Sequence, residues 1–164
     1  MRLKLNCPPS VRHSCRWFKF CFTVILTTIS ASVLAAGNIN VDSSNGLAIH
    51  GYDPVAYFVS GEPREGIAAY SYEFEGTKWA FVNEENKQAF IANPDAYIPQ
   101  YGGHCAYAAS KNSIANTDPY AWTIHDGKLY LNYSKGVRTL WSLSRDSNID
   151  KANGYWPELA RTIK

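Results

Sequence analysis

The chain of 164 residues has 16 basic and 14 acidic residues, which gives a formal net charge of +2 at pH 7. Five of the basic residues lie within the first 19 positions and no acidic residue precedes Asp42, so residues 36–164 carry 11 basic against 14 acidic residues. The basic excess belongs to the N-terminal segment alone and gives no argument for nucleic-acid binding.

The N-terminal segment has the layout of a secretory signal peptide. Its basic residues precede a mostly apolar run of about 15 residues and then the small residues Ala35-Ala36-Gly37. This run is shorter than the ~20 residues that span a bilayer. We interpret residues 1–35 as a signal peptide cleaved after Ala35, and expect an exported, periplasmic protein of a Gram-negative bacterium with no stable membrane span. The alternative is an uncleaved N-terminal helix that anchors the chain.

Cleavage would leave a single cysteine. Cys7, Cys15 and Cys21 lie in the leader, so Cys105 is left without a disulfide partner in its own chain. The remaining 129 residues suit one domain with one core. We expect a short polar lead-in at residues 36–45 and a single domain at residues 46–161.

The first elements are a short helix and a hairpin. Asp53-Pro54 predicts a helix start, because Asp caps well and Pro suits the first helical position. Two alternating segments, Tyr70–Phe74 and Trp79–Phe81, flank Gly76 and predict a hairpin. Its predicted register places five aromatic residues on one face: Tyr70, Tyr72, Phe74, Trp79 and Phe81.

A helix and a second hairpin follow. Asn83 is expected to cap a helix that runs to about Ala92. Asp126-Gly127 is a strong two-residue hairpin signal. The register it predicts pairs Ile124 with Leu129 and Trp122 with Leu131 on the buried face, and sets His125 opposite Lys128 on the other.

Two further helices are expected at residues 134–143 and 148–161. Gly76 precedes Phe90 by the same 14 positions that separate Gly127 from Trp141. One matched spacing does not establish a duplication, but it favours a mixed architecture. The predicted fold class is α+β: a small antiparallel sheet built from two hairpins, with helices packed on one face.

The segment around Cys105 holds the candidate chemistry. If residues 101–110 form a helix, Cys105 lies in its first turn, where the helix dipole favours thiolate. The alternative is a small buried residue among alanines, since Cys is one of the most buried residue types. The preceding pair Gly102-Gly103 leaves the backbone open to close approach.

Three residues form a candidate metal site. His50 precedes a turn and could meet His104 and Cys105 across the fold, as ligands for copper, zinc or haem iron. On a helix, the adjacent His104 and Cys105 would point in different directions, so their pairing needs a loop. His125 is interpreted as a surface residue and is left out of this set.

Clustered tyrosines allow two interpretations. Tyr52, Tyr57, Tyr97, Tyr101 and Tyr107 could line a pocket for a flat ligand. They could instead build a core whose hydroxyl groups reach water or backbone. The sequence contains no nucleophile elbow, phosphate-binding glycine loop or zinc-protease motif, so a standard hydrolase or nucleotide enzyme is unsupported.

Three motifs together resemble the exported YHS domain-containing proteins. They are Gly51-Tyr-Asp53-Pro54-Val-Ala-Tyr-Phe58, then Asn93-Pro-Asp-Ala-Tyr97 continuing to Tyr101-Gly102-Gly103-His-Cys-Ala-Tyr107, and finally Asp118-Pro-Tyr-Ala-Trp122 with Gly127–Tyr133. The resemblance covers residues 46–159 in the same order, and the family is mostly uncharacterised.

The resemblance implies a metal-binding role that this chain only partly fits. Shorter YHS-type domains bind metal through cysteines, and the matching positions here are Ala56, Val82 and Asn86. His104 also stands where long-form relatives have an aromatic residue. We therefore expect an exported binding or accessory module, for a metal ion or metal cofactor, rather than an enzyme. The alternatives are a thiol-dependent enzyme or redox protein that uses Cys105, and a structural partner in an envelope protein complex.

Overall fold

The computed structural model describes residues 38–163. The predicted signal peptide lies outside these residues, as does the start of the polar lead-in. Within the described part of the chain, no helix combines the length and the apolar character needed to cross a bilayer.

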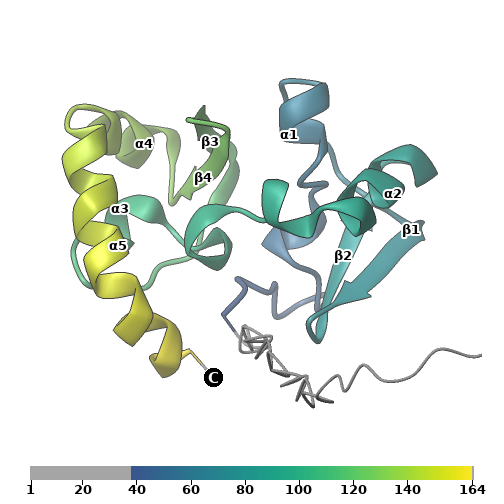
Figure 1. The fold of residues 1–164 in the computed structure, drawn as a ribbon, viewed down its shortest axis with the longest axis horizontal. Coiled ribbons are helices and arrows are strands. Elements are labelled where there is room, and N and C mark those ends of the chain that lie inside the picture. The colour runs from purple at the N-terminus through teal and green to yellow at the C-terminus, as the bar shows by residue number, and fades with distance from the viewer. Residues whose placement is uncertain (1–37, 164) are drawn as a thin grey trace, which may run out of the picture. The chain divides into compact units, whose positions relative to one another are not determined.

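The first hairpin forms as predicted. Strands β1 (Ile67–Phe74) and β2 (Thr77–Phe81) are antiparallel and pair Tyr72 with Trp79 (Figure 1). Positive φ angles at both turn residues, Glu75 and Gly76, suit the right-handed twist of a two-residue hairpin. The five aromatic residues expected on one face all belong to one hydrophobic cluster, which confirms that prediction.

The capped helices also form where the sequence predicts them. The side chain of Asn83 accepts a hydrogen bond from the Asn86 N–H (2.8 Å) at the start of α2 (Glu84–Ala92). Asp53 accepts from the N–H groups of Val55 (2.8 Å) and Ala56 (3.2 Å) and so begins α1 (Ala56–Val59). Each cap satisfies backbone donors that the first helical turn leaves free.

The second hairpin has the predicted register. Strands β3 (Asp118–His125) and β4 (Lys128–Asn132) pair Trp122 with Leu131 and His125 with Lys128. Leu129 and Leu131 belong to the first hydrophobic cluster, as predicted, but Tyr130 on the opposite face is also buried, in a second cluster. Both faces of β4 are therefore covered.

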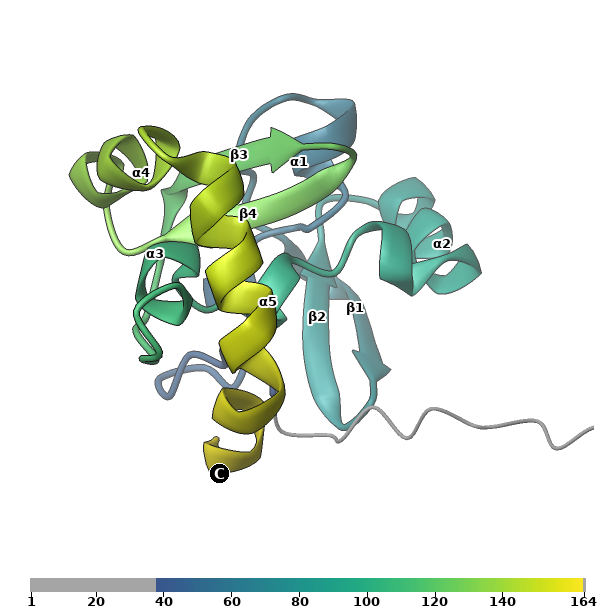
Figure 2. The same ribbon diagram turned by 60° about the vertical axis from the view of Figure 1, so that its left-hand side comes forward.

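Helices α3 (Ala106–Ala109) and α4 (Lys135–Ser142) pack against β4, and α5 (Arg145–Thr162) packs against these helices (Figure 2). Ser134 caps α4 through a bond from the Val137 N–H (3.2 Å). The second cluster lies among these elements and includes the fully buried Trp141 and Ala152.

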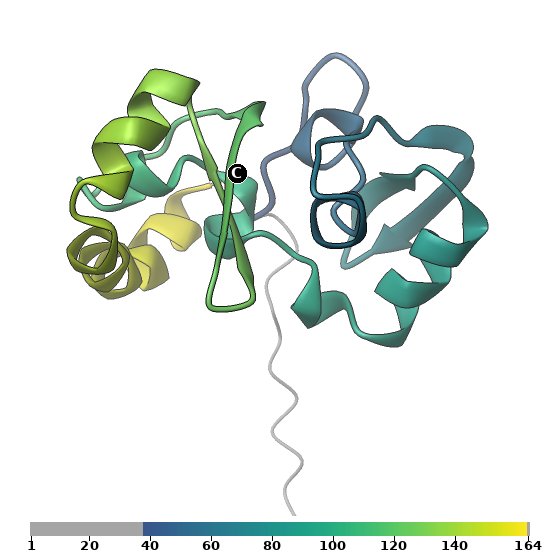
Figure 3. The ribbon, with the colours of Figure 1, turned by 90° about the horizontal axis from the view of Figure 1, so that it is seen from above.

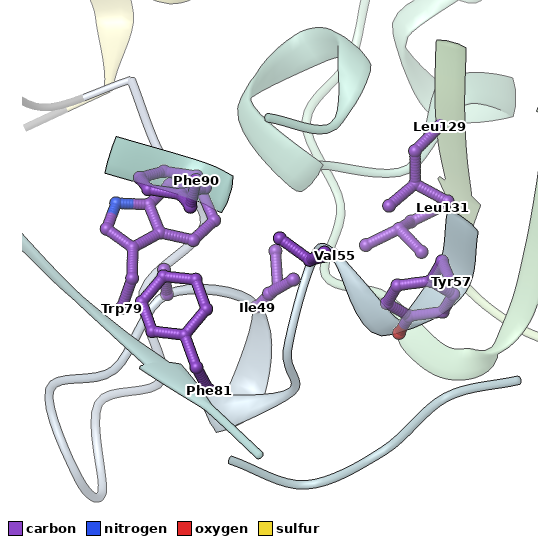
Figure 4. Packing of buried hydrophobic residues seen from close by; sticks show 9 residues of the cluster. Ile49, Val55, Tyr57, Trp79, Phe81, Phe90, Leu129 and Leu131 are labelled. Atoms are coloured by element: carbon purple, nitrogen blue, oxygen red, sulfur yellow. The ribbon is translucent and has the colours of Figure 1, made fainter. Parts of the chain in front are cut away.

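The two hairpins do not join into one sheet. Each forms a two-stranded sheet of its own, with α2 packed on the first and α4 on the second (Figure 3). The α+β class with helices packed on hairpins is confirmed. The link between the hairpins is the first hydrophobic cluster, in which Ile49 and Val55 lie between the aromatic residues of the first hairpin and the leucines of the second (Figure 4).

The two hairpin–helix segments form structural repeats 51 positions apart. β1 and β3 start at residues 67 and 118, the capping residues are 83 and 134, and the fully buried helix aromatics are residues 90 and 141. Both hairpins carry a register shift at the same point, between residues 67 and 71 and between residues 118 and 122. We call β1, β2 and α2 the first repeat, and β3, β4 and α4 the second.

Side-chain packing follows the same repeat. Phe90 lies on Trp79 with ring centroids 5.1 Å apart and planes at 36°, and Trp141 lies on Tyr130 at 5.2 Å and 35°. The single matched spacing in the sequence thus corresponds to two backbones with the same plan.

Of the two alternatives for residues 101–110, helix or loop, the structure has a helix only at Ala106–Ala109. The 3-10 segment Ile49–Gly51 precedes α1, and two more, Pro94–Ala96 and Gln100–Gly103, lie between α2 and α3. Tyr101, Gly102 and Gly103 have positive φ, and His104 is extended, so α3 begins only after Cys105. Left-handed backbone at successive residues cannot continue a right-handed helix.

Candidate functional site

Cys105 is buried and engaged on both sides. Its residue is 2% exposed; the sulfur accepts a hydrogen bond from the Tyr133 N–H (3.3 Å) and the thiol donates weakly to the Asn132 side-chain oxygen (3.8 Å). The thiol therefore fastens the end of β4 to the start of α3. The interpretation as a small buried residue fits this position better than that of an exposed nucleophile.

His104 faces a different part of the fold. Successive side chains of an extended segment point to opposite sides. While Cys105 meets β4, the ring of His104 lies 6.0 Å from that of Trp156 on α5. His104 is 8% exposed, and neither ring nitrogen has a hydrogen-bond partner among residues 38–163. Burial lowers the pKa of His104, an effect partly offset by the neighbouring Ala115 carbonyl.

His50 is held apart from both residues. Its ring nitrogens lie 3.2 Å from the Asp42 carboxylate and 2.9 Å from the side-chain oxygen of Asn116. Bonds from Ser44, and then the bond with His50, lower the pKa of Asp42 to about 2. Over the described range, no group of three or more His, Cys, Asp or Glu residues is arranged to hold a metal ion. The structure thus does not bring His50, His104 and Cys105 together.

The space beside Gly102 and Gly103 is occupied by residues of the polar lead-in. The Asn40 N–H donates to the Gly102 carbonyl (2.7 Å), and the Asn40 side chain donates to the Gly103 carbonyl (3.2 Å). A Cβ at Gly102 would lie 1.8 Å from the Asn38 carbonyl oxygen. The close approach predicted for this pair is therefore an internal contact with the polar lead-in.

Two of the five candidate pocket tyrosines pack against β3. The Tyr57 hydroxyl donates to the Pro119 carbonyl (3.1 Å), and its ring meets Trp122 edge to face at 5.5 Å. Tyr52 meets Tyr120 edge to face at 5.9 Å. The neighbouring Tyr120 hydroxyl, together with burial, raises the pKa of Tyr52, whereas burial is the main cause that raises the pKa of Tyr57.

The other three tyrosines lie in separate places. Tyr97 packs on Phe58 (5.5 Å), and Tyr101 packs on Trp156 (5.6 Å) in the second cluster. Tyr107 lies on α3 with a lysine above its ring. The five residues serve as packing elements and do not surround one pocket.

The Asp53 carboxylate accepts four hydrogen bonds, two of them from the first repeat. It is fully buried, and besides its two bonds to α1 it accepts from the Val82 N–H (2.9 Å) and the Asn86 side chain (2.7 Å). Positions 56, 82 and 86 thus converge on one carboxylate. In the second repeat, the Tyr133 N–H, 51 positions after that of Val82, is bound by the sulfur of Cys105.

A surface hollow that the sequence did not predict lies around His125. It has a volume of about 400 Å³ and is lined by His125 and residues 142–147, at the turn between α4 and α5. Serine hydroxyls, a guanidinium and a carboxylate supply most of the lining, and Leu143 supplies an apolar edge.

Charged groups orient the imidazole of His125 in the hollow. Its Nε2 lies 3.3 Å from Asp146 Oδ1 and 3.5 Å from Asp126 Oδ2, while Nδ1 lies 3.3 Å from Arg145 Nη1. A neutral ring with the proton on Nε2 fits all three contacts, since Nε2 then donates to carboxylate and Nδ1 accepts from guanidinium. The Arg145 guanidinium in turn lies 5.7 Å above the Trp141 ring.

The first repeat has an aromatic residue at the position equivalent to His125. Phe74 occupies the position 51 residues before His125, and its ring packs edge to face on Phe90 at 5.8 Å. The same backbone position therefore carries an aromatic contact in the first repeat and an imidazole that lines a hollow in the second. His125 lies opposite Lys128 as predicted, and its side chain is a quarter exposed at this surface hollow.

A signal for this site does exist in the sequence. The 51-residue interval aligns Phe74 with His125, both directly before a two-residue turn that ends in glycine. The signal is that His125 stands where the first repeat has an aromatic residue of the core. Comparisons of the chain with protein-family models, curated proteins and solved structures found no match.

Proposed function

We propose that this protein is an exported binding or accessory domain, without catalytic activity, that holds a small polar ligand in the hollow around His125. The observation that carries the proposal is the replacement of Phe74 by His125 between the two repeats. A fold that carries an aromatic ring at this position does not itself require an imidazole there, so the difference favours a role in binding.

The state of Cys105 argues against a thiol enzyme. A nucleophilic cysteine has to reach its substrate as thiolate, which requires access and a charged or dipolar environment. Cys105 is 2% exposed, and its sulfur accepts a backbone hydrogen bond. This thiol supports the packing of α3 rather than a reaction.

Metal binding stays a prediction. The candidate set His50, His104 and Cys105 is dispersed over three places, and the converging positions around Asp53 carry no thiolate. The convergence itself supports the resemblance to the YHS family, since it places the matching positions about one point. Export is supported by the leader of the sequence alone.

The test is a fragment titration followed by NMR. Small carboxylates, amines and polyols at about 1 mM, a concentration that detects weak ligands, are added to ¹⁵N-labelled protein. At least one class is expected to shift the amide signals of residues 142–147 in a saturable way. His125→Phe, which installs the residue of the first repeat, is expected to abolish these shifts, whereas the control His50→Phe keeps them. Absence of saturable shifts at the hollow for all three classes would refute the binding role.

A further inference from the structure

The outer edge of β1 is open. Among residues 38–163, the backbone of Ile67–Phe74 makes no hydrogen bond except to β2, and no isolated bridge reaches it. The other edge of this hairpin is covered, since the Ala48 N–H donates to the Lys78 carbonyl on β2 (2.9 Å). An open edge presents a row of unpaired N–H and C=O groups to any other strand.

The second repeat closes the same edge with side chains. Arg138 Nη1 donates to the Trp122 carbonyl on β3 (3.0 Å), and the Tyr57 hydroxyl donates to the Pro119 carbonyl (3.1 Å). Lys87 stands 51 positions before Arg138, but its ammonium group binds Glu84 on its own helix instead (3.4 Å). The difference between the repeats leaves β1 as the accessible edge.

β1 carries little of the protection that is usual for an edge strand: one charged residue, Glu73, and one register shift, between residues 67 and 71. No charged residue occurs between Glu65 and Glu73, and Ile67, Ala68 and Ala69 are exposed. Natural edge strands are commonly protected by lysine, proline or an inward-pointing charge. A two-stranded sheet is also marginal by itself, whereas four strands are a common sheet size.

We propose that β1 pairs antiparallel with β1 of a second copy of this chain across a two-fold axis, which forms a four-stranded sheet β2–β1–β1–β2. A two-fold interface places the same segment on both sides, so the charged residues of β1 must not oppose each other across it. The positions of the glutamates therefore limit the pairing register.

Glutamate pairing restricts where the axis can lie. If the two-fold axis passes at residue 69, Glu65 of one copy lies opposite Glu73 of the other, and if it passes at residue 70, Glu65 lies opposite Glu75. An axis at residue 73 or 74 likewise places two glutamates of the two copies opposite each other. Like charges directly opposite each other destabilise a sheet. Within residues 69–74, only an axis at Ser71 or Tyr72 avoids this.

The experiment measures self-association by analytical ultracentrifugation of the mature chain from about 1 μM to about 1 mM, a range that covers weak and moderate dimers. In both registers Ala69 lies opposite a glutamate of the other copy, Glu73 or Glu75. Ala69→Glu is therefore expected to raise the dimer Kd about tenfold, because the two-fold axis creates two repulsive pairs. Ala69→Lys is expected to lower the Kd by a similar factor.

Ala92→Glu, the same change at an exposed residue on α2, is the matched control and is expected to leave the Kd unchanged. Hydrogen exchange locates the dimer interface, since the β1 amides are expected to gain protection as the protein concentration rises. A chain that stays monomeric up to 1 mM overturns the proposal. A dimer whose Kd changes by the same factor and in the same direction for Ala69→Glu and Ala69→Lys also overturns it. If Ala69→Glu folds poorly, Ala69→Lys still tests the proposal.

Discussion

Acid sensitivity should arise from His104. As pH falls, the unfolded chain takes up a proton near the ordinary histidine pKa of 6.5, whereas the folded chain does so only at lower pH because burial lowers the pKa of His104. The unfolded state then binds more protons than the folded state. The contribution of His104 to stability is complete above that pKa and is lost as pH falls through and below 6.5.

The size of the effect follows from the number of protons. One proton taken up only on unfolding lowers the free energy of unfolding by at most about 1.4 kcal/mol for each pH unit. Since no ring nitrogen of His104 has a partner among the described residues, His104→Phe removes two unsatisfied polar atoms and keeps a ring against Trp156. We expect its stability at pH 7.5 to lie within about 1 kcal/mol of wild type.

The assay is urea unfolding followed by tryptophan fluorescence at pH 7.5, 6.5 and 5.5. The difference in unfolding free energy between wild type and His104→Phe should shift in favour of the variant as pH falls. His50→Gln is the matched control, and it should retain the slope that His104 supplies. Parallel pH profiles for wild type and His104→Phe would show that the buried imidazole titrates normally and would refute the reasoning.

Three further predictions concern buried positions. Cys105 should resist a thiol reagent in native protein and react fully after denaturation, because it is 2% exposed; rapid reaction of native protein would contradict its place in the core. Asp53→Asn should lower the free energy of unfolding by about 2–3 kcal/mol, since an amide leaves at least one of four donors without an acceptor, and an unchanged urea midpoint would contradict this. Gly103→Ala should lower the melting temperature more than Gly127→Ala, because both have positive φ but only Gly103 has an atom within 2.5 Å of the new Cβ; equal shifts would rule out the steric argument.

Local structure follows the sequence closely in both repeats. The Asp126-Gly127 turn sets the register of the second hairpin, and Asn83 and the serine at 134 each begin a helix with a side-chain cap. These features depend on a few consecutive residues, so they can be recognised before any tertiary contact is known. The choice between helix and loop at residues 101–105 could not be made from the sequence, because the left-handed backbone there is held by Asn40, more than 60 positions away.

The sequence by itself determined the two hairpins and their helices, because turns, caps and alternation are short-range properties, and it shows Cys105 as the single cysteine of residues 36–164. Only the tertiary structure decided where the chemistry-bearing side chains lie: Cys105 beside β4, His104 beside Trp156 on α5, and His125 at a hollow, where the first repeat has the Phe74–Phe90 contact. The physical reason is that burial and hydrogen bonding of a side chain depend on partners distant in sequence. Two repeats with one backbone plan can therefore differ in what each can bind.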